Sequence, residues 1–368
     1  MFDNIRGGFS YEIFPGAFST NIFSQPYSRQ VFTVTSDTMD LNFIVSRVKY
    51  SVSGQVISTD AKEASGVTIK ISRDGADPIE LTTNSGGGFA TNLDGYYRYT
   101  ITATKNGLTF GPLSYTFDLN RNLPLRFYVG ASTSVAVSAA TYLSQPIPAS
   151  GIISLFGTGL SEKALAANGE VTYELDGTSV YFGDEQNIGG RCQLIYVSPL
   201  QINFLMPTGV ISKKAVFRVI RNEFVASVAV AQISRVTPGI FSANSDGRGP
   251  AVGLLLRVRA DGSYGYEEIV DYDSALKRYV ARPIDFGPES DQLYLELYGT
   301  GIRDDDPSVK VKIGDIDVPV LYAGRQSQFI GLDQVNVQLP RSLAGKGEVN
   351  IQLTAITYPA NTVTIKFK

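Results

Sequence analysis

Apolar and polar residues alternate in short runs along most of the chain, as in YYRYTITAT, LRFYV and QVNVQLP. A period of two is typical of half-buried strands, because successive side chains point to opposite faces of a sheet. Gly, Pro and Asp separate the runs. Successive parallel strands would need helical crossovers, and helix signals are weak. We therefore predict an all-β protein, a string of antiparallel β-sandwich domains.

Two short segments depart from this pattern. SEKALAAN, from Ser161 to Asn168, is the best helix signal and predicts two turns that end before Gly169. The small, polar run at residues 131–146 predicts a linker that leads into a first edge strand.

Residues 131–368 contain an internal duplication. Four blocks recur in the same order: Gly151–Gly159 with Gln292–Gly301, Val180–Asp184 with Val311–Asp315, Leu194–Ser198 with Val320–Gly324, and Gln201–Pro207 with Gln334–Pro340. In each half, turn residues separate strand-length runs at the spacing of an immunoglobulin-like sandwich. We predict one such domain at 131–238 and a second, with a Tyr-rich insertion, at 239–368.

A different repeat occupies the first 130 residues. Residues 48–130 hold a complete module, and residues 1–47 match only its second half. The matches are Gly8–Ile13 with Gly95–Ile101 and Phe23–Ser28 with Phe110–Ser114. An incomplete sandwich exposes unpaired strand edges, which a neighbouring copy could cover by strand addition to build a filament. The alternative is that this sequence is a fragment, with further modules and the export signal upstream.

The complete module carries three marked stretches: Ser53–Val56, Gly66–Ile69 and the run TTNSGGGFATNLDGYYRYTITATKNGLTF. In these stretches it resembles the carboxypeptidase regulatory-like (transthyretin-like) domain. The resemblance implies a seven-stranded sandwich that acts as a spacer or adhesive unit and carries no catalysis.

Longer motifs mark the chain from about residue 134 to its end. They are SLFGTGL at 154–160, YVSP at 196–199, QINF at 201–204, LRVRADGS at 256–263, PIDFGP at 283–288, LYGTGIR at 297–303, LYAG at 321–324 and GLDQVNVQLPRSLAGKGEVN at 331–350. In these motifs the chain resembles the C-terminal domain family of acidobacterial (Solibacter-type) exported proteins. The resemblance implies a terminal module of large secreted or surface proteins, with no known catalytic residues. Cys192 is a departure, since we expect Pro or a small residue there.

Composition excludes several kinds of chemistry. The chain has no His and one Cys, so it can build no Ser-His-Asp set and no His- or Cys-based zinc site. Its net charge is −3 and it has no strongly basic block, so nucleic-acid binding lacks electrostatic support. Cys192 cannot form a disulfide within the chain, and its strand-like surroundings predict a buried, unreactive residue. We predict no cofactor, no bound metal and no enzymatic activity.

The predicted location is extracellular or at the cell surface. No run approaches eighteen apolar residues, which predicts that the chain has no membrane span. The start, MFDNIRGGFSYEIF, lacks the basic-then-apolar pattern of a signal peptide, so we expect the export signal to be absent from this chain.

Tyrosines are the main candidates for contact with a ligand or partner. The insertion DGSYGYEEIVDYDSALKRYV mixes aromatic and charged residues, which suits glycan stacking, a protein interface or packing between the two halves. The candidate residues are Tyr264, Tyr266, Tyr272 and Tyr279.

Amides and carboxylates give weaker signals. Gln201 with Asn203, and Gln334 with Asn336, share one strand face in each copy. They either bind a ligand or, as we favour, bond the neighbouring backbone. The acidic run 304–306 suggests a calcium ligand set but lacks the spacing of a calcium loop, as do Asp271 and Asp273. A solvated turn is therefore the preferred interpretation of these carboxylates.

These observations predict a non-enzymatic extracellular structural or adhesive protein. Its expected partners are proteins, including copies of itself in a homopolymeric filament, or a glycan, and not nucleic acid. The alternative is a carbohydrate-binding accessory region of a larger secreted protein. An enzyme that uses only Asp, Glu, Ser, Lys or Tyr remains the third hypothesis, and no motif points to it.

Overall fold

The computed structural model describes residues 48–58, 61–144, 146–184, 189–207, 213–303 and 308–368, and the backbone of two paired strands, β1 (Ser10–Ile13) and β2 (Gln30–Thr33). With 57% strand and 2% helix, the protein is all-β, which confirms the predicted fold class. It divides into two compact units, Met1–Val129 and Gly130–Lys368. Apart from β1 and β2, the predicted half-module at 1–47 lies outside the described residues. Within the described ranges, no helix is long and apolar enough to cross a membrane.

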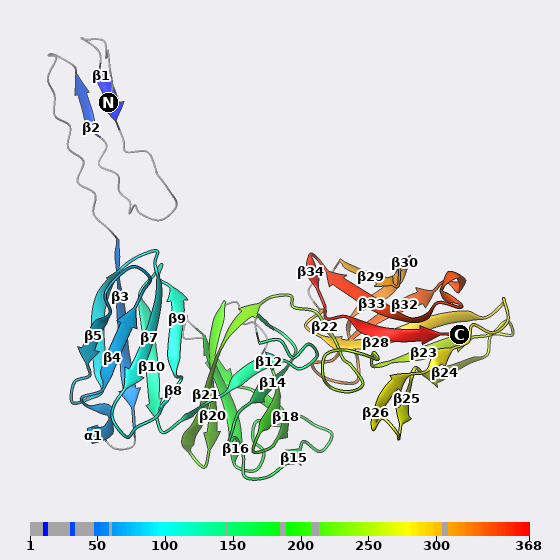
Figure 1. Ribbon diagram of the computed structural model, residues 1–368, viewed down its shortest axis with the longest axis horizontal. Helices are drawn as coiled ribbons and strands as arrows, with labels where there is room; N and C mark the ends of the chain where they lie inside the picture. The colour runs from blue at the N-terminus through cyan, green and yellow to red at the C-terminus, as the bar shows by residue number, and fades with distance from the viewer. Residues whose placement is uncertain are drawn as a thin grey trace. The chain divides into compact units, whose positions relative to one another are not determined.

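The first unit contains a sandwich of two four-stranded sheets, ordered β6-β3-β10-β8 and β5-β4-β7-β9 (Figure 1). Its elements are β3 (Lys49–Ile57), α1 (Ala61–Ala64), β4 (Thr68–Ser72), β5 (Ile79–Thr82), β6 (Gly88–Asp94), β7 (Arg98–Thr104), β8 (Phe110–Gly111), β9 (Ser114–Asp118) and β10 (Leu123–Val129). Alternate residues point inward, and Phe127 of one sheet meets Tyr115 of the other edge-on, with ring centroids 5.2 Å apart. The alternating pattern thus forms the core directly.

The second unit begins with a sandwich whose sheets run β11-β21-β20-β16-β17, with β13 beside β21, and β12-β14-β19-β18-β15. Its strands are β11 (Ser132–Thr133), β12 (Val135–Ser138), β13 (Ile147–Pro148), β14 (Ile152–Phe156), β15 (Leu165–Ala166), β16 (Thr178–Asp184), β17 (Gly189–Arg191), β18 (Gln193–Val197), β19 (Gln201–Leu205), β20 (Lys214–Arg221) and β21 (Phe224–Ser234). Its core includes Phe204 and Phe217, and Cys192 is fully buried there. The prediction of a buried Cys192 is confirmed.

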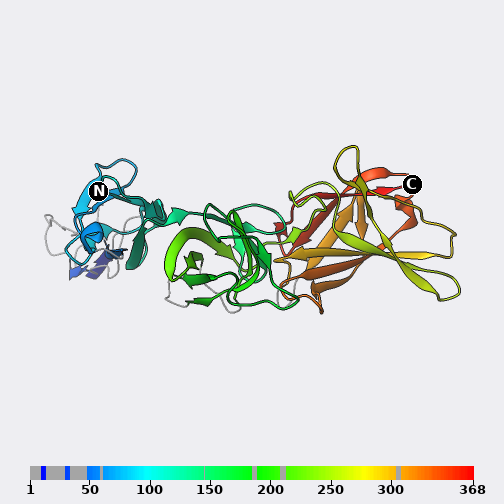
Figure 2. The same cartoon turned by 90° about the horizontal axis from the view of Figure 1, so that it is seen from below.

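A second sandwich follows, with sheets β24-β23-β28-β32-β31, joined by β22, and β27-β35-β33-β29-β30, joined by β34. Its elements are β22 (Gly239–Ile240), β23 (Gly253–Val258), β24 (Tyr264–Glu268), β25 (Val270–Asp273), β26 (Arg278–Ala281), β27 (Pro283–Ile284), β28 (Gln292–Thr300), β29 (Val309–Ile313), β30 (Ile316–Val318), β31 (Val320–Arg325), β32 (Asp333–Leu339), the 3-10 turn η1 (Arg341–Leu343), β33 (Gly347–Ala355), β34 (Tyr358–Pro359) and β35 (Val363–Phe367). Strands β25 and β26 form a separate hairpin (Figure 1). Figure 2 shows the strands of this second sandwich from below, coloured from yellow-green to red.

The duplication extends to strand register. In the first copy β14 pairs with β19 so that Ser154 faces Asn203, and in the second β28 pairs with β32 so that Glu296 faces Asn336. The next strand carries a bulge at the same place in both copies, which sets Tyr196 and Tyr322 opposite the two asparagines. The repeated sequence blocks therefore build the same sheet twice.

Most strand pairs are antiparallel, as predicted. Among the described strands, four pairs are parallel: β3 with β10, β11 with β21, β13 with β21, and β27 with β35. In each case the partners are far apart in sequence, so intervening strands make the crossover and no helix is needed.

Two local predictions need correction. Ser161–Asn168 forms no helix, because Leu165 and Ala166 pair with β18 as strand β15. An isolated helix of eight residues has only marginal stability, so pairing with the edge of the sheet is favoured over the helix. The segment 131–146 is an edge strand as predicted, with β12 beside β14, but it is not a solvated linker. It contains a run of buried residues that belong to the sandwich: Ala136, Val137, Ser138, Ala139 and Ala140.

Candidate functional site

Two of the four candidate tyrosines lie on an edge strand of the second sandwich, and the other two lie on the separate β25–β26 hairpin. Tyr264 and Tyr266 are on β24 and are 70% and 55% exposed. Tyr272 and Tyr279 face each other across the β25–β26 hairpin, with ring centroids 5.4 Å apart in an edge-on contact. Asn244 holds the hairpin through the backbone N–H and C=O of Tyr279, both at 2.9 Å. The structure thus divides the four into a sheet pair and a hairpin pair.

Tyr266 belongs to a larger polar and aromatic surface on the β24-β23-β28-β32-β31 sheet. Residues opposite one another in the register share a face, and alternate residues such as Leu255, Leu295 and Val335 point the other way, into the core. We call this surface the tyrosine–amide face. It consists of Tyr266, Glu268, Leu254, Leu256, Tyr294, Glu296, Tyr298, Gln334, Asn336, Gln338 and Tyr322.

Glu296 connects two of the tyrosines on this face. Its carboxylate accepts hydrogen bonds from the Tyr298 hydroxyl at 3.2 Å and the Tyr266 hydroxyl at 3.4 Å. Burial, with the negative charge of Glu296, raises the pKa of Tyr298 to about 12. The same charge is the largest cause that raises the pKa of Tyr266. Both phenols are therefore protonated donors at neutral pH.

The amide pairs bond within their own strand. Gln334 Nε2 donates to Asn336 Oδ1 at 2.8 Å, and Gln201 Nε2 donates to Asn203 Oδ1 at 2.9 Å. Our preferred interpretation, bonds to neighbouring backbone, is wrong for these two contacts, because each amide finds its partner two residues along the same face. The bond orders both side chains and fixes the asparagine Oδ1 as the acceptor.

The second sandwich packs on one end of the equivalent face of the first copy. Ile152 N donates to Thr300 Oγ1 at 2.8 Å, and Thr300 Oγ1 donates to Gly331 O at 3.0 Å. Gly331 has φ +87°, and a Cβ there would lie 2.3 Å from Leu205 Cδ2 and 2.9 Å from Ile152 Cγ1. Only glycine permits this approach. We call these contacts the joint.

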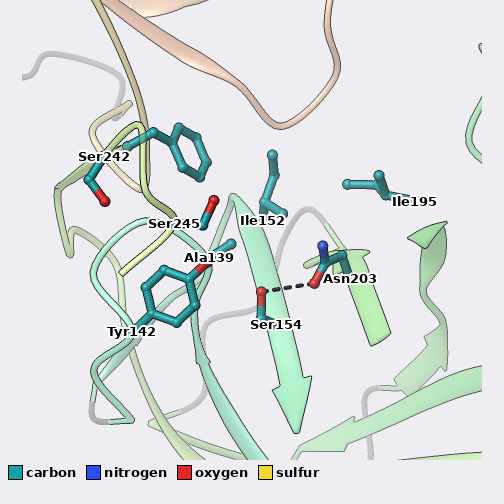
Figure 3. A pocket seen from close by; sticks show the side chains of 9 residues that line it. Ala139, Tyr142, Ile152, Ser154, Ile195, Asn203, Ser242 and Ser245 are labelled. Atoms are coloured by element: carbon teal, nitrogen blue, oxygen red, sulfur yellow. Dashed lines mark hydrogen bonds between the residues drawn. The ribbon is translucent and has the colours of Figure 1, made fainter. Parts of the chain in front are cut away.

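A cavity of about 230 Å³ lies beside the joint (Figure 3). Its lining is neutral and comes from both sandwiches: Ala139, Tyr142, Ile152, Ser154, Ile195, Asn203, Phe241, Ser242 and Ser245. Ser154 donates to Asn203 Oδ1 at 2.9 Å, and Figure 3 shows the Asn203 amide nitrogen on the side toward Ile152. Burial raises the pKa of Tyr142. Tyr142 is the only ionisable group in this lining.

The candidate acidic residues have structural partners where the structure describes them. Asp271 pairs with Arg282, whose hydrogen bond lowers the pKa of the Asp271 carboxyl. Asp273 caps the hairpin turn through the N–H groups of Ala275 and Leu276 at 2.9 and 3.0 Å. The acidic run 304–306 lies outside the described residues. Among the residues that the structure describes, no three His, Cys, Asp or Glu residues gather as a metal site would require.

Comparison with known proteins adds no relative. No family model matches the sequence, and no curated protein matches it either. The two family resemblances stay predictions.

Glu296, Tyr294 and Tyr298 were absent from the candidates that the sequence alone suggested. They lie in the run QLYLELYGTG, which has the alternating pattern of an ordinary half-buried strand. A comparison of the two copies distinguishes these residues. At the register positions of Glu296, Tyr294 and Tyr298, the first copy has Ser154, Ile152 and Phe156, respectively.

Proposed function

We propose that this protein is a non-enzymatic structural and adhesive protein of the cell exterior. Its β-sandwich domains act as a scaffold, and the last sandwich holds the tyrosine–amide face toward a partner.

One observation carries the proposal: the two copies use the same sheet face differently. In the first copy, Ile152 and Leu205 pack against the second sandwich. In the second copy, Tyr294 and Gln338 take these positions, and Tyr266 beside them is 55% exposed. A face that makes a domain contact in one copy and carries ordered tyrosines in the other suits recognition of something outside the chain.

The joint supports a scaffold role. Thr300 is fully buried and relays two hydrogen bonds between the sandwiches, so their connection is a packed contact and not a flexible linker. Polymerisation by strand addition depends on residues 1–47. These lie outside the described residues apart from β1 and β2, and the filament stays a prediction.

The location is tested on intact source cells with an antibody raised against residues 130–368. We expect immunogold labelling outside the cell envelope, and loss of the antigen when intact cells are treated with protease. Labelling confined to the cytoplasm of sectioned cells, with antigen that resists protease until lysis, would contradict the proposal. Negative-stain images of the same cells show whether labelled material is filamentous.

Adhesion is tested with the purified chain immobilised on beads. We expect source cells or their extracellular matrix to be retained, and Tyr266→Ala with Tyr294→Ala to reduce retention. Tyr272→Ala, on the hairpin and 59% exposed, is the matched control. Equal retention of cells by the unaltered chain, the double variant, Tyr272→Ala and uncoated beads would contradict the adhesive role.

A further inference from the structure

We propose that the tyrosine–amide face binds an extended, uncharged polysaccharide that lies across strands β24, β23, β28 and β32. This inference rests on the proposed adhesive function and specifies the ligand class of the same face. The residues of the tyrosine–amide face, their charge and their difference from the first copy each indicate which class of ligand fits this face.

The shape of the tyrosine–amide face suits an extended chain. Tyr266, Leu256 and Tyr294 lie opposite one another on three adjacent strands. Adjacent strands are about 4.8 Å apart, so the Cα atoms of the two tyrosines are about 10 Å apart, a length comparable to that of two consecutive sugar rings. The Tyr266 hydroxyl reaches Glu296 of β28, so these two side chains meet over β23. The row therefore offers an extended chain a continuous strip of aromatic and apolar contact.

The side chains of the tyrosine–amide face match the chemistry of a sugar. Sugar rings have apolar C–H faces and polar hydroxyl edges, so their binding sites combine aromatic rings with fixed hydrogen-bonding groups. Beside the tyrosine row lie Glu296, which is already oriented by two phenols, and Asn336, which is oriented by Gln334. Glu296 supplies carboxylate acceptors and Asn336 supplies N–H donors. Ordering these groups before binding lowers the entropy cost of recognition.

The charge of the tyrosine–amide face favours a neutral ligand. The tyrosine–amide face contains two carboxylates, Glu268 and Glu296, and none of its residues is Lys or Arg. Glu268 and Glu296 both contribute to the raised pKa of Tyr298, so their fields overlap on this surface. A polyanion would meet like charge here. The face therefore favours an uncharged chain over an acidic polysaccharide.

The second copy does not suit the obvious alternative ligand, another protein domain docked as in the joint. That contact depends on the apolar side chains of Ile152 and Leu205 and on the close approach of Gly331. The second copy has Tyr294 and Gln338 at the first two positions. Burying these polar groups under a similar apolar contact would leave hydrogen-bonding groups without partners. The two copies therefore differ in the direction expected for a hydrated ligand.

The proposal is tested by retention of the purified chain on insoluble cellulose, chitin, xylan, starch and β-1,3-glucan, with polygalacturonate as the polyanionic comparison. We expect saturable binding to at least one uncharged polymer, and none to polygalacturonate. The double variant Tyr266→Ala, Tyr294→Ala should weaken that binding about tenfold or more, since both aromatic contacts are lost. Glu296→Gln tests the contribution of the carboxylate and should weaken polysaccharide binding by a smaller factor.

Tyr272→Ala is the matched control, because it removes an exposed tyrosine from the hairpin and leaves the tyrosine–amide face intact. Its binding should equal that of the unaltered chain, and thermal melts must show that every variant is folded. Failure to bind any uncharged polymer, binding to polygalacturonate alone, or equal loss in Tyr272→Ala overturns the proposal. Cell retention that is lost in the double variant, with no polysaccharide bound, would overturn the glycan inference and leave the adhesive function standing. An intracellular location would instead remove the proposed function.

Discussion

The buried Asp333 ties the strand β32 to the bend after β28. Its Oδ2 accepts the backbone N–H groups of Ile302 and Arg303 at 2.9 and 3.2 Å, and its Oδ1 bonds the Arg303 guanidinium. Burial raises the pKa of Asp333, and Arg303 opposes this rise. Removing one partner of a buried ion pair leaves the other charge uncompensated, so Asp333→Ala should lower the free energy of unfolding by about 3–5 kcal/mol.

Urea denaturation measures this effect, with Asp317→Ala as the control. The Asp317 side chain is 85% exposed and lies 3.8 Å from Lys312, so its removal should change stability by about 1 kcal/mol or less. A similar loss in the two variants would show that Asp333 is not a structural anchor.

Tyr298 makes the protein sensitive to alkaline pH. Its folded-state pKa of about 12 lies above the ordinary value of 10.0, because burial and Glu296 disfavour the phenolate. The stability that this group contributes is therefore fully present below pH 10 and is lost as pH rises toward 12. In Glu296→Gln, burial remains but the charge is gone, so the pKa of Tyr298 should fall and stay above 10.0. Carbon-13 NMR of labelled tyrosine, with Tyr298→Phe for assignment, checks both statements.

At the scale of single elements, the turn before β6 depends on glycine for a reason that can be tested. Gly87 has φ +79°, and a Cβ there would lie 2.3 Å from the Val56 carbonyl oxygen, whereas Gly75, with φ +71°, has open space around it. Gly75→Ala should cost about 1 kcal/mol, the strain of a left-handed residue. Gly87→Ala adds a backbone clash and should cost about 1–3 kcal/mol more. Equal unfolding midpoints in urea would rule out the clash.

Strands were predictable from sequence because each alternating run has a buried face that sets its register. The strand within Ser161–Asn168 was not predictable in this way. Its pairing partner, β18, lies some thirty residues further along the chain, and local propensity carries no information about a partner at that distance. The same limit applies to the candidate site. Tyr264 and Tyr266 stood out within the Tyr-rich insertion, but the neighbours of Tyr266, including Tyr294 and Glu296, come from other strands and depend on register.

At the scale of the whole second unit, the duplication provides a matched pair of positions at which to test how the two sandwiches are held together. Thr300 and Thr158 occupy the same place in the repeated Gly-Thr-Gly bend. Thr300 is fully buried in the joint, where it bonds Ile152 and Gly331, while Thr158 is exposed. Valine keeps the shape of threonine but neither donates nor accepts a hydrogen bond.

Thr300→Val should therefore leave the Ile152 N–H and the Gly331 C=O unpaired at the joint, at a cost of about 1–3 kcal/mol. Because the loss falls between the two sandwiches, we expect their unfolding transitions in urea to separate and protease cleavage near residues 234–238 to accelerate. Thr158→Val should leave both measurements within error of the unaltered chain, since its side chain faces solvent. If the two variants behave alike, the joint does not depend on Thr300, and the scaffold role would have to rest on apolar packing around Gly331 alone.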